Sequence, residues 1–181
     1  MEILETPLAG LKIIKLDLYQ DDRGFFVERF TRSKFAEFGL DKDFIQDNHS
    51  MSQANIVRGL HYQHDPVQEK LVGCVAGKIF DVAVDIRKDS PTFGKNFGII
   101  LDQATLLWIP GGFAHGFCNV STESAHLFYK ISGGEYNAAG EGGIMWNDPE
   151  LNIAWPVAEP IISARDAKQQ SFAQYKNNPK F

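Results

Sequence analysis

The sequence is poor in cysteine, with only Cys74 and Cys118 among 181 residues. Both lie in apolar runs, so we expect buried reduced thiols and no disulfide framework. No apolar run approaches the ~20 residues that a membrane-spanning helix needs. The first residues show no basic region followed by an apolar stretch, which is the pattern of a secretory signal. These absences predict a cytoplasmic protein without a membrane partner.

The sequence also lacks an excess of positive charge, because 23 acidic residues outnumber 18 lysines and arginines and give a net charge of -5. This balance argues against nucleic acid as a partner, whereas a locally basic pocket would still accept a small anionic substrate. No repeat, low-complexity tract or linker interrupts the chain. We therefore expect one domain over residues 1–181.

Aromatic residues are frequent, at 12% of the chain, and glycine recurs regularly, a composition that favours β structure. The clearest strand covers residues 79–87, where four apolar residues alternate with a face that carries Asp81 and Asp85. Further strands are predicted at residues 11–18, 25–30, 56–63, 71–76, 97–101, 104–109, 116–120 and 125–131, with turns at 21–24 and 77–78. Such spacing predicts a sandwich or barrel.

Helical patterns are restricted to residues 33–40 and 163–175. In the first, Ser33 is expected to cap the helix, and Phe35, Phe38 and Leu40 are expected to pack inward. In the second, Ser163 would be the N-cap, with Asp166 at the third helical position. Alternatively, Asp166 would orient a histidine ring, as carboxylates do in catalytic triads. The sequence pattern leaves both roles of Asp166 open.

A first group of reactive residues comprises Arg58 and His61 on one predicted strand and Lys70 on the next. Residues three apart face opposite sides of a regular strand, but a bulge at Gly59 would change this parity. Histidine is the natural general base near neutral pH, while lysine and arginine stabilise an oxyanion or hold phosphates. The alternative is a structural core histidine with two surface cations.

Residues 110–119 read P-x-G-x-x-H-x-x-x-N, which resembles the second sequence motif of the cupin superfamily. In metal-binding cupins the histidine of this motif, here His115, is a ligand. Their first motif supplies His-x-His, but Gln63 occupies the second histidine position here, and His64 should point the opposite way. A substitute ligand set would be His61, His115 and Glu69. The sequence thus favours the fold but not a metal.

A further candidate is Tyr129, near the end of the predicted strand at 125–131. A tyrosine can act as a general acid towards a carbanion, although most strand tyrosines are structural.

Eight motifs occur in order along the chain: Asp22–Phe26, Gln46–Ser50, Arg58–His61, Phe80–Arg87, Ser90–Gly94, Ile109–Phe117, Trp146–Pro149 and Ile153–Pro156. Over about Gly10 to Asp166, their combination resembles the dTDP-4-dehydrorhamnose 3,5-epimerase family.

The resemblance implies a mainly β fold, a cupin-like jelly-roll β-barrel with a few short peripheral helices. It further implies a homodimer that shares N-terminal strands, and no metal or organic cofactor. The implied activity is epimerisation at C3 and C5 of dTDP-4-dehydro-6-deoxy-D-glucose, giving dTDP-4-dehydro-L-rhamnose in dTDP-L-rhamnose biosynthesis. This pathway supplies cell-surface polysaccharide.

The resemblance also implies roles for individual residues. His61 matches the general base, Asp166 the carboxylate that orients it, Tyr129 the general acid, and Lys70 the cation near the keto oxygen. Substrate-contacting positions of the family are matched by Arg23, Glu28, Gln46, Asn48, Arg58, His115, Glu141 and Arg165.

Two positions depart from the family pattern. Arg165 stands where the family has a lysine, and the two cations bind phosphate differently. The stretch 131–136 keeps only Tyr136 where the family more often has two adjacent tyrosines. Three alternative functions remain: a C3-only epimerase on a related nucleotide 4-keto sugar, a metal-dependent cupin oxygenase or isomerase, and a non-catalytic sugar-binding cupin. The joint presence of an acid and a base argues against the last.

Overall fold

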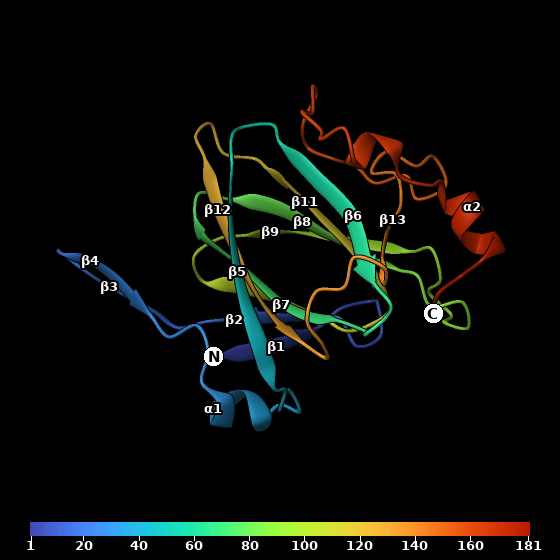
Figure 1. Ribbon diagram of the computed structural model, residues 1–181. Helices are drawn as coiled ribbons and strands as arrows, with labels where there is room; N and C mark the ends of the chain where they lie inside the picture. The colour runs from blue at the N-terminus through green and yellow to red at the C-terminus, as the bar shows by residue number, and fades with distance from the viewer.

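Two β-sheets packed face to face form the body of the computed structural model, which describes residues 1–181 (Figure 1). In order across the larger sheet lie β1 (Glu2–Glu5), β2 (Lys12–Lys15), β10 (Thr105–Ile109), β7 (Glu69–Ala76), β12 (Ala125–Ser132) and β5 (Phe44–Ser52). In order across the smaller sheet lie β13 (Glu141–Gly143), β6 (Val57–Gln63), β11 (Phe113–Asn119), β8 (Ile79–Asp85) and β9 (Asn96–Leu101). The paired strands within each sheet are antiparallel.

Apolar side chains lie on both faces of β8, in the middle part of the smaller sheet. Ile79 and Ala83 belong to the core between the two sheets. Val82 and Val84 point the other way, into a second core with Tyr175 of the C-terminal segment. The alternation predicted for this strand is therefore confirmed, and both of its faces are buried.

The expected mainly β architecture with short peripheral helices is confirmed, but the sheets do not close into a barrel. At one edge of the larger sheet, β5 pairs only with β12, and β13 forms an edge of the smaller sheet. The peripheral elements are α1 (Arg32–Ala36), α2 (Phe172–Asn177) and the short 3₁₀ helix η1 (Asp166–Lys168). Neither α1 nor α2 has the length and apolar character needed to cross a membrane.

Both helix predictions need correction in detail. The helix α1 follows Thr31, whose side chain makes no capping hydrogen bond, so Ser33 is not its cap. Phe38 is 42% exposed and does not pack inward. The predicted helix at 163–175 is divided into η1 and α2, and α2 begins after Ser171, which forms a capping box with Gln174.

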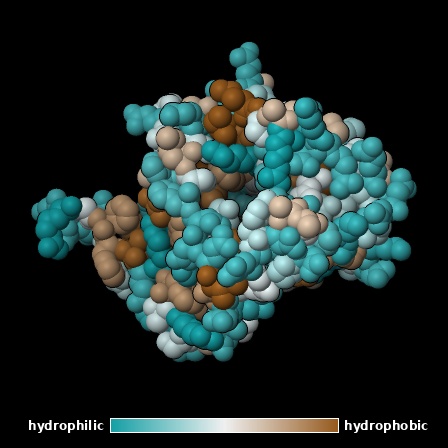
Figure 2. Space-filling model, in the orientation of Figure 1, coloured by the Kyte–Doolittle hydropathy of each residue, from teal (hydrophilic) through white to brown (hydrophobic).

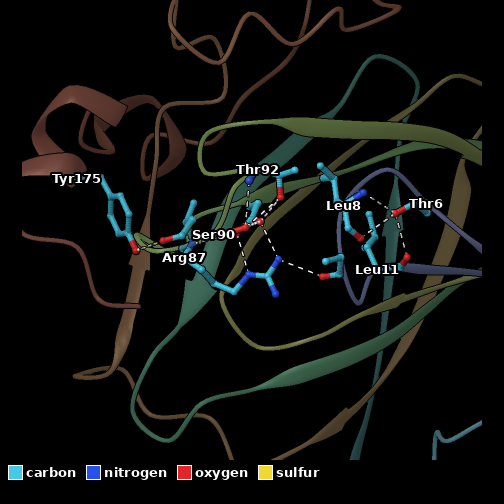
Figure 3. A network of polar contacts seen from close by, with 10 residues as sticks. Thr6, Leu8, Leu11, Arg87, Ser90, Thr92 and Tyr175 are labelled. Atoms are coloured by element: carbon cyan, nitrogen blue, oxygen red, sulfur yellow. Dashed lines mark hydrogen bonds and ion pairs between the residues drawn. The ribbon is translucent and has the colours of Figure 1, made fainter.

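A hydrogen-bonded network around buried Asp85 stabilises the loop after β8. Figure 3 labels three of its members, Arg87, Ser90 and Thr92. The carboxylate accepts hydrogen bonds from Arg87 at 2.7 Å, Ser90 at 2.5 Å and Thr92 at 2.6 Å. Burial alone would raise the pKa of Asp85, but these hydrogen bonds lower it to about 2. Arg87 also donates to the carbonyl oxygen of Ala9, which connects the loop to the N-terminal segment.

The two cysteines are free and buried, as expected. Burial raises the pKa of Cys74 to about 11 and the pKa of Cys118 to about 12, so both remain neutral thiols.

A hairpin of β3 (Leu18–Asp21) and β4 (Gly24–Val27) projects from the body as a separate arm (Figure 1). It exposes three aromatic side chains, those of Tyr19, Phe25 and Phe26. Figure 2 shows hydrophobic surface along this arm and a hydrophilic tip. The turn at residues 21–24 is the one that the sequence predicts.

Candidate active site

A bulge in β6 brings Arg58 and His61 to the same side of the strand. His115 of β11 pairs with His61, whereas Phe117 pairs with Arg58, so β6 has one residue more than its partner. Gly59 adopts φ +120, and a Cβ atom there would lie 2.6 Å from the Cα of Gly116. The bulge that the sequence suggested at Gly59 is present, and Arg58 and His61 line one cavity.

His61 is held by a carboxylate from a distant part of the chain. Its Nε2 atom lies 2.6 Å from Oδ1 of Asp166, the first residue of η1. The backbone N–H of Gly59 donates to the other carboxylate oxygen, and Ser163 accepts the backbone N–H of Asp166. Burial opposes the ionisation of Asp166, but the hydrogen bonds from His61 and Gly59 leave its pKa below the ordinary value.

A cavity of about 310 Å³ opens between the two sheets beside His61. Tyr129 and Lys70 reach it from the larger sheet, and the ammonium of Lys70 lies 5.7 Å from the centre of the Tyr129 ring. Its other lining residues are Gln46, Asn48, Tyr62, Gln63, Gln68, Ile131, Tyr136 and Glu141. Thus, the sequence-predicted base and acid come from opposite sheets to one cavity.

Burial is the largest cause of the pKa shifts of the two groups from the larger sheet. It lowers the pKa of Lys70, although the carboxylates of Glu141 and Asp81 act in the opposite direction. Burial also raises the pKa of Tyr129, with Asn48 opposing this shift through its side chain. Tyr129 therefore stays protonated at neutral pH and retains a proton to donate.

Two arginines line an adjacent cavity of about 370 Å³, on the Asp166 side of His61. Arg58 is oriented by β5, because it donates to Oγ of Ser52 at 3.0 Å and to the carbonyl oxygen of Met51 at 3.1 Å. Arg165 forms an ion pair of 2.6 Å with Glu141. This cavity offers two guanidinium groups, which suit a phosphate or diphosphate.

His115 has a buried partner that sequence reasoning did not assign. Its Nε2 atom lies 2.9 Å from Oδ2 of Asp81, a carboxylate with no exposed surface. In the sheet, His115 is the direct neighbour of His61 across the β6–β11 pair. The signal was present, because the strand alternation places Asp81 inward and a buried carboxylate requires a partner.

The structure does not bring His61, His115 and Glu69 together as a substitute set of metal ligands. The carboxylate of Glu69 accepts hydrogen bonds from Lys42 and Ser132, and Glu69 does not line the cavity beside His61. No group of three or more histidine, cysteine, aspartate or glutamate side chains is arranged to hold a metal ion.

Within one chain, two predicted substrate residues lie away from the site. Arg23 is 90% exposed near the tip of the arm and pairs there with Asp21. Glu28 pairs with Lys34 at 2.7 Å and lines a separate cavity beside α1. The other six predicted substrate residues, Gln46, Asn48, Arg58, His115, Glu141 and Arg165, lie in or next to the two cavities around His61.

Comparisons with known proteins show which family the chain is similar to. A sequence model of the family described as dTDP-4-dehydrorhamnose 3,5-epimerase matches residues 5–174. A Shigella flexneri protein named dTDP-4-dehydrorhamnose 3,5-epimerase is 47% identical over 176 residues, covering 95% of this chain and 96% of that protein.

Solved structures are similar over nearly the whole chain. The epimerase RmlC from Legionella pneumophila, in complex with dTDP-4-keto-L-rhamnose, matches with a TM-score of 0.90 and 44% identity, covering 95% of this chain and 93% of that chain. ChmJ from Streptomyces bikiniensis, described as a 3'-monoepimerase and bound to dTDP-quinovose, matches with a TM-score of 0.87 and 31% identity, covering 95% and 88%.

Proposed function

The chain belongs to the dTDP-4-dehydrorhamnose 3,5-epimerase family, and on that premise we propose that it epimerises dTDP-4-dehydro-6-deoxy-D-glucose at C3 and C5. The product is dTDP-4-dehydro-L-rhamnose, an intermediate of dTDP-L-rhamnose biosynthesis. The observation that carries the proposal is one cavity with His61, held by Asp166, in one wall, and Tyr129 and Lys70 in the other.

The chemistry needs an acid, a base and a cation. A ketone at C4 acidifies the hydrogens at C3 and C5, and removal of either proton gives an enolate whose charge lies on the C4 oxygen. Inversion then requires a base on one face of the sugar and an acid on the other. His61 and Tyr129, which reach the cavity from opposite sheets, meet this requirement.

His61 is the proposed base. The hydrogen bond from Nε2 to Asp166 fixes one ring proton there and leaves Nδ1 free to accept a proton from carbon. The carboxylate then stabilises the imidazolium that forms. Tyr129 returns a proton from the opposite face and completes the inversion.

Lys70 is the proposed stabiliser of the enolate. Its side chain lines the cavity, and although burial lowers its pKa, a nearby enolate oxygen favours the charged form and is stabilised by it more strongly than in water. Arg58 and Arg165 in the adjacent cavity are the proposed partners of the diphosphate.

The proposal includes a cytoplasmic homodimer. The exposed arm supports the homodimer, because it holds three aromatic side chains and Arg23 away from the chain's own cavity. Exchange of arms between two copies would bring Arg23 and Glu28 to the partner's site, as the family resemblance implies.

The product of a single incubation tests the function. NMR of the sugar after incubation with dTDP-4-dehydro-6-deoxy-D-glucose should show both C3 and C5 inverted. Inversion at C3 alone would assign the protein to the monoepimerase type that ChmJ represents. An unchanged sugar would overturn the proposal.

A further inference from the structure

Gln63 occupies a position that no proposed chemical step uses. It follows His61 by two residues on β6, so the two side chains share one face of the strand. It is only 4% exposed, lines the same cavity, and pairs in register with Glu141 of β13. A buried carboxamide in such a place must satisfy its polar atoms within the protein.

The side chain of Gln63 makes three hydrogen bonds to backbone atoms. Its Nε2 donates to the carbonyl oxygens of Pro66 at 3.0 Å and Glu135 at 2.9 Å. Its Oε1 accepts the backbone N–H of Asn137 at 2.9 Å. Gln63 thus connects the turn after β6 to the loop of residues 133–137, which we call the mouth loop.

The mouth loop presents Tyr136 at the opening of the cavity. The ring is 57% exposed, and its hydroxyl donates to Glu141 at 2.9 Å. The loop begins with Gly133, at φ +92, and Gly134, which lack side chains to pack. Two glutamines supply the missing anchoring, because Gln68 also donates to the carbonyl oxygen of Gly134, at 3.1 Å.

We propose that Gln63 is a positioning residue that fixes the mouth loop and thereby sets the affinity for the nucleotide end of the substrate. The inference rests on the proposed function: when the sugar lies between His61 and Tyr129, the activating nucleotide must extend towards the opening. An exposed aromatic ring there offers a surface for a base. Gln63 itself touches backbone and acts through Tyr136.

The test is the pair of variants Gln63→Glu and Gln63→Met. The first removes both donors and places a carboxylate against two carbonyl oxygens, and the second removes all three hydrogen bonds at similar volume. Each should raise KM about 10- to 100-fold and leave kcat within about threefold, since only binding common to the ground and transition states is lost. The Kd of dTDP alone, measured by calorimetry, should rise by the same factor.

Two comparisons separate positioning from general damage. Gln103→Glu is the matched control, because Gln103 also donates its amide to a backbone carbonyl, that of Gly77, in a turn outside the cavity. It should leave KM and dTDP affinity unchanged. Tyr136→Ala should reproduce the loss of Gln63→Met, and the double variant should be no worse than Tyr136→Ala alone.

The outcomes distinguish this inference from the proposed function. If the wild-type protein neither binds dTDP nor turns over the sugar, the proposed function fails. If the wild type does both, but the Gln63 variants keep its KM and dTDP affinity, the inference is overturned. Losses in kcat alone, or fully additive losses with Tyr136→Ala, would overturn it as well.

Discussion

At the scale of single residues, the proposed reaction depends on the contact between His61 and Asp166. The two residues are 105 positions apart, and their side-chain atoms approach to 2.6 Å. The lowered pKa of Asp166 keeps its carboxylate charged at neutral pH. A charged partner favours the imidazolium that proton abstraction creates, which supports the assignment of the base to His61.

Replacement of Tyr129 by phenylalanine separates the two halves of the reaction. The variant keeps His61 and Lys70, so the first proton should still leave the sugar in deuterated water. Completed inversion should slow by about 10²- to 10⁴-fold, the usual contribution of a positioned acid. NMR measures deuterium incorporation and inversion in the same sample. Equal loss of both would argue against an acid role for Tyr129.

For single residues, the sequence identified candidate side chains better than it identified which side chains contact one another. Local pattern left Asp166 as either a capping residue or the partner of a histidine. In the structure, Ser163 accepts the backbone N–H of Asp166 while the carboxylate bonds to His61. Only tertiary packing brings the C-terminal segment to β6, so the family resemblance, and not spacing, pointed to this contact. The partner of Asp81 likewise required the register of β8 and β11.

At the scale of elements, the longest strand escaped the sequence pattern. β5 covers nine residues, and its burial alternates along its length. Its less exposed positions carry Gln46, Asn48 and Ser50, while Ile45 and Met51 are exposed. A strand whose inner face lines a polar cavity loses the apolar alternation by which strands are recognised. The strand that the sequence pattern did not predict is therefore one that lines the candidate site.

Glycine gave a more reliable signal. The sequence suggested that Gly59 permits a bulge, and the close approach of Gly116 explains why no larger residue fits. The bulge is what turns Arg58 and His61 towards one cavity. In contrast, the break between η1 and α2 lay inside a continuous helical pattern, and contacts with the sheet decide it: β6 holds Asp166, and Ile144 pairs with Gln170.

The Asp85 network predicts a pH-dependent contribution to stability. The pKa of Asp85 falls from 3.8 to about 2 on folding. Because the folded pKa is the lower one, the contribution is fully present above pH 3.8 and disappears as the pH falls through about 2. Asp85→Asn should therefore lower the free energy of unfolding by about 2 kcal/mol at pH 7.

Urea unfolding between pH 2 and pH 7 measures this difference. The wild type and Asp85→Asn should converge at the acid end of the range. Asp89→Asn, an exposed carboxylate in the same loop, is the matched control and should differ little from the wild type at any pH. A deficit of Asp85→Asn that persists unchanged at pH 2 would contradict the assignment.

At the scale of the whole molecule, one chain leaves the predicted substrate site incomplete. Arg23 and Glu28 lie on or beside the arm, away from His61. The sequence resemblance could match these residues to family positions, but neither the sequence nor a single chain supplies the second copy that would use them. The exposed aromatic residues of the arm are the physical feature that indicates a surface for a partner.

Mixed subunits test arm exchange directly. If the proposed homodimer exchanges arms, Arg23→Ala and His61→Asn should each be strongly impaired alone. In a refolded equimolar mixture, heterodimers form one site with both native residues, so activity should recover to about a quarter of the wild-type value for random pairing in a two-fold dimer. A mixture no more active than its components would contradict exchange.

Proton exchange at the sugar tests the central claim most directly. The protein is incubated with dTDP-4-dehydro-6-deoxy-D-glucose in deuterated water, and NMR follows the hydrogens at C3 and C5. The account predicts that the wild type incorporates deuterium at both carbons and that His61→Asn incorporates it at neither above the uncatalysed rate. Exchange by His61→Asn at the wild-type rate would contradict the assignment of His61 as the base.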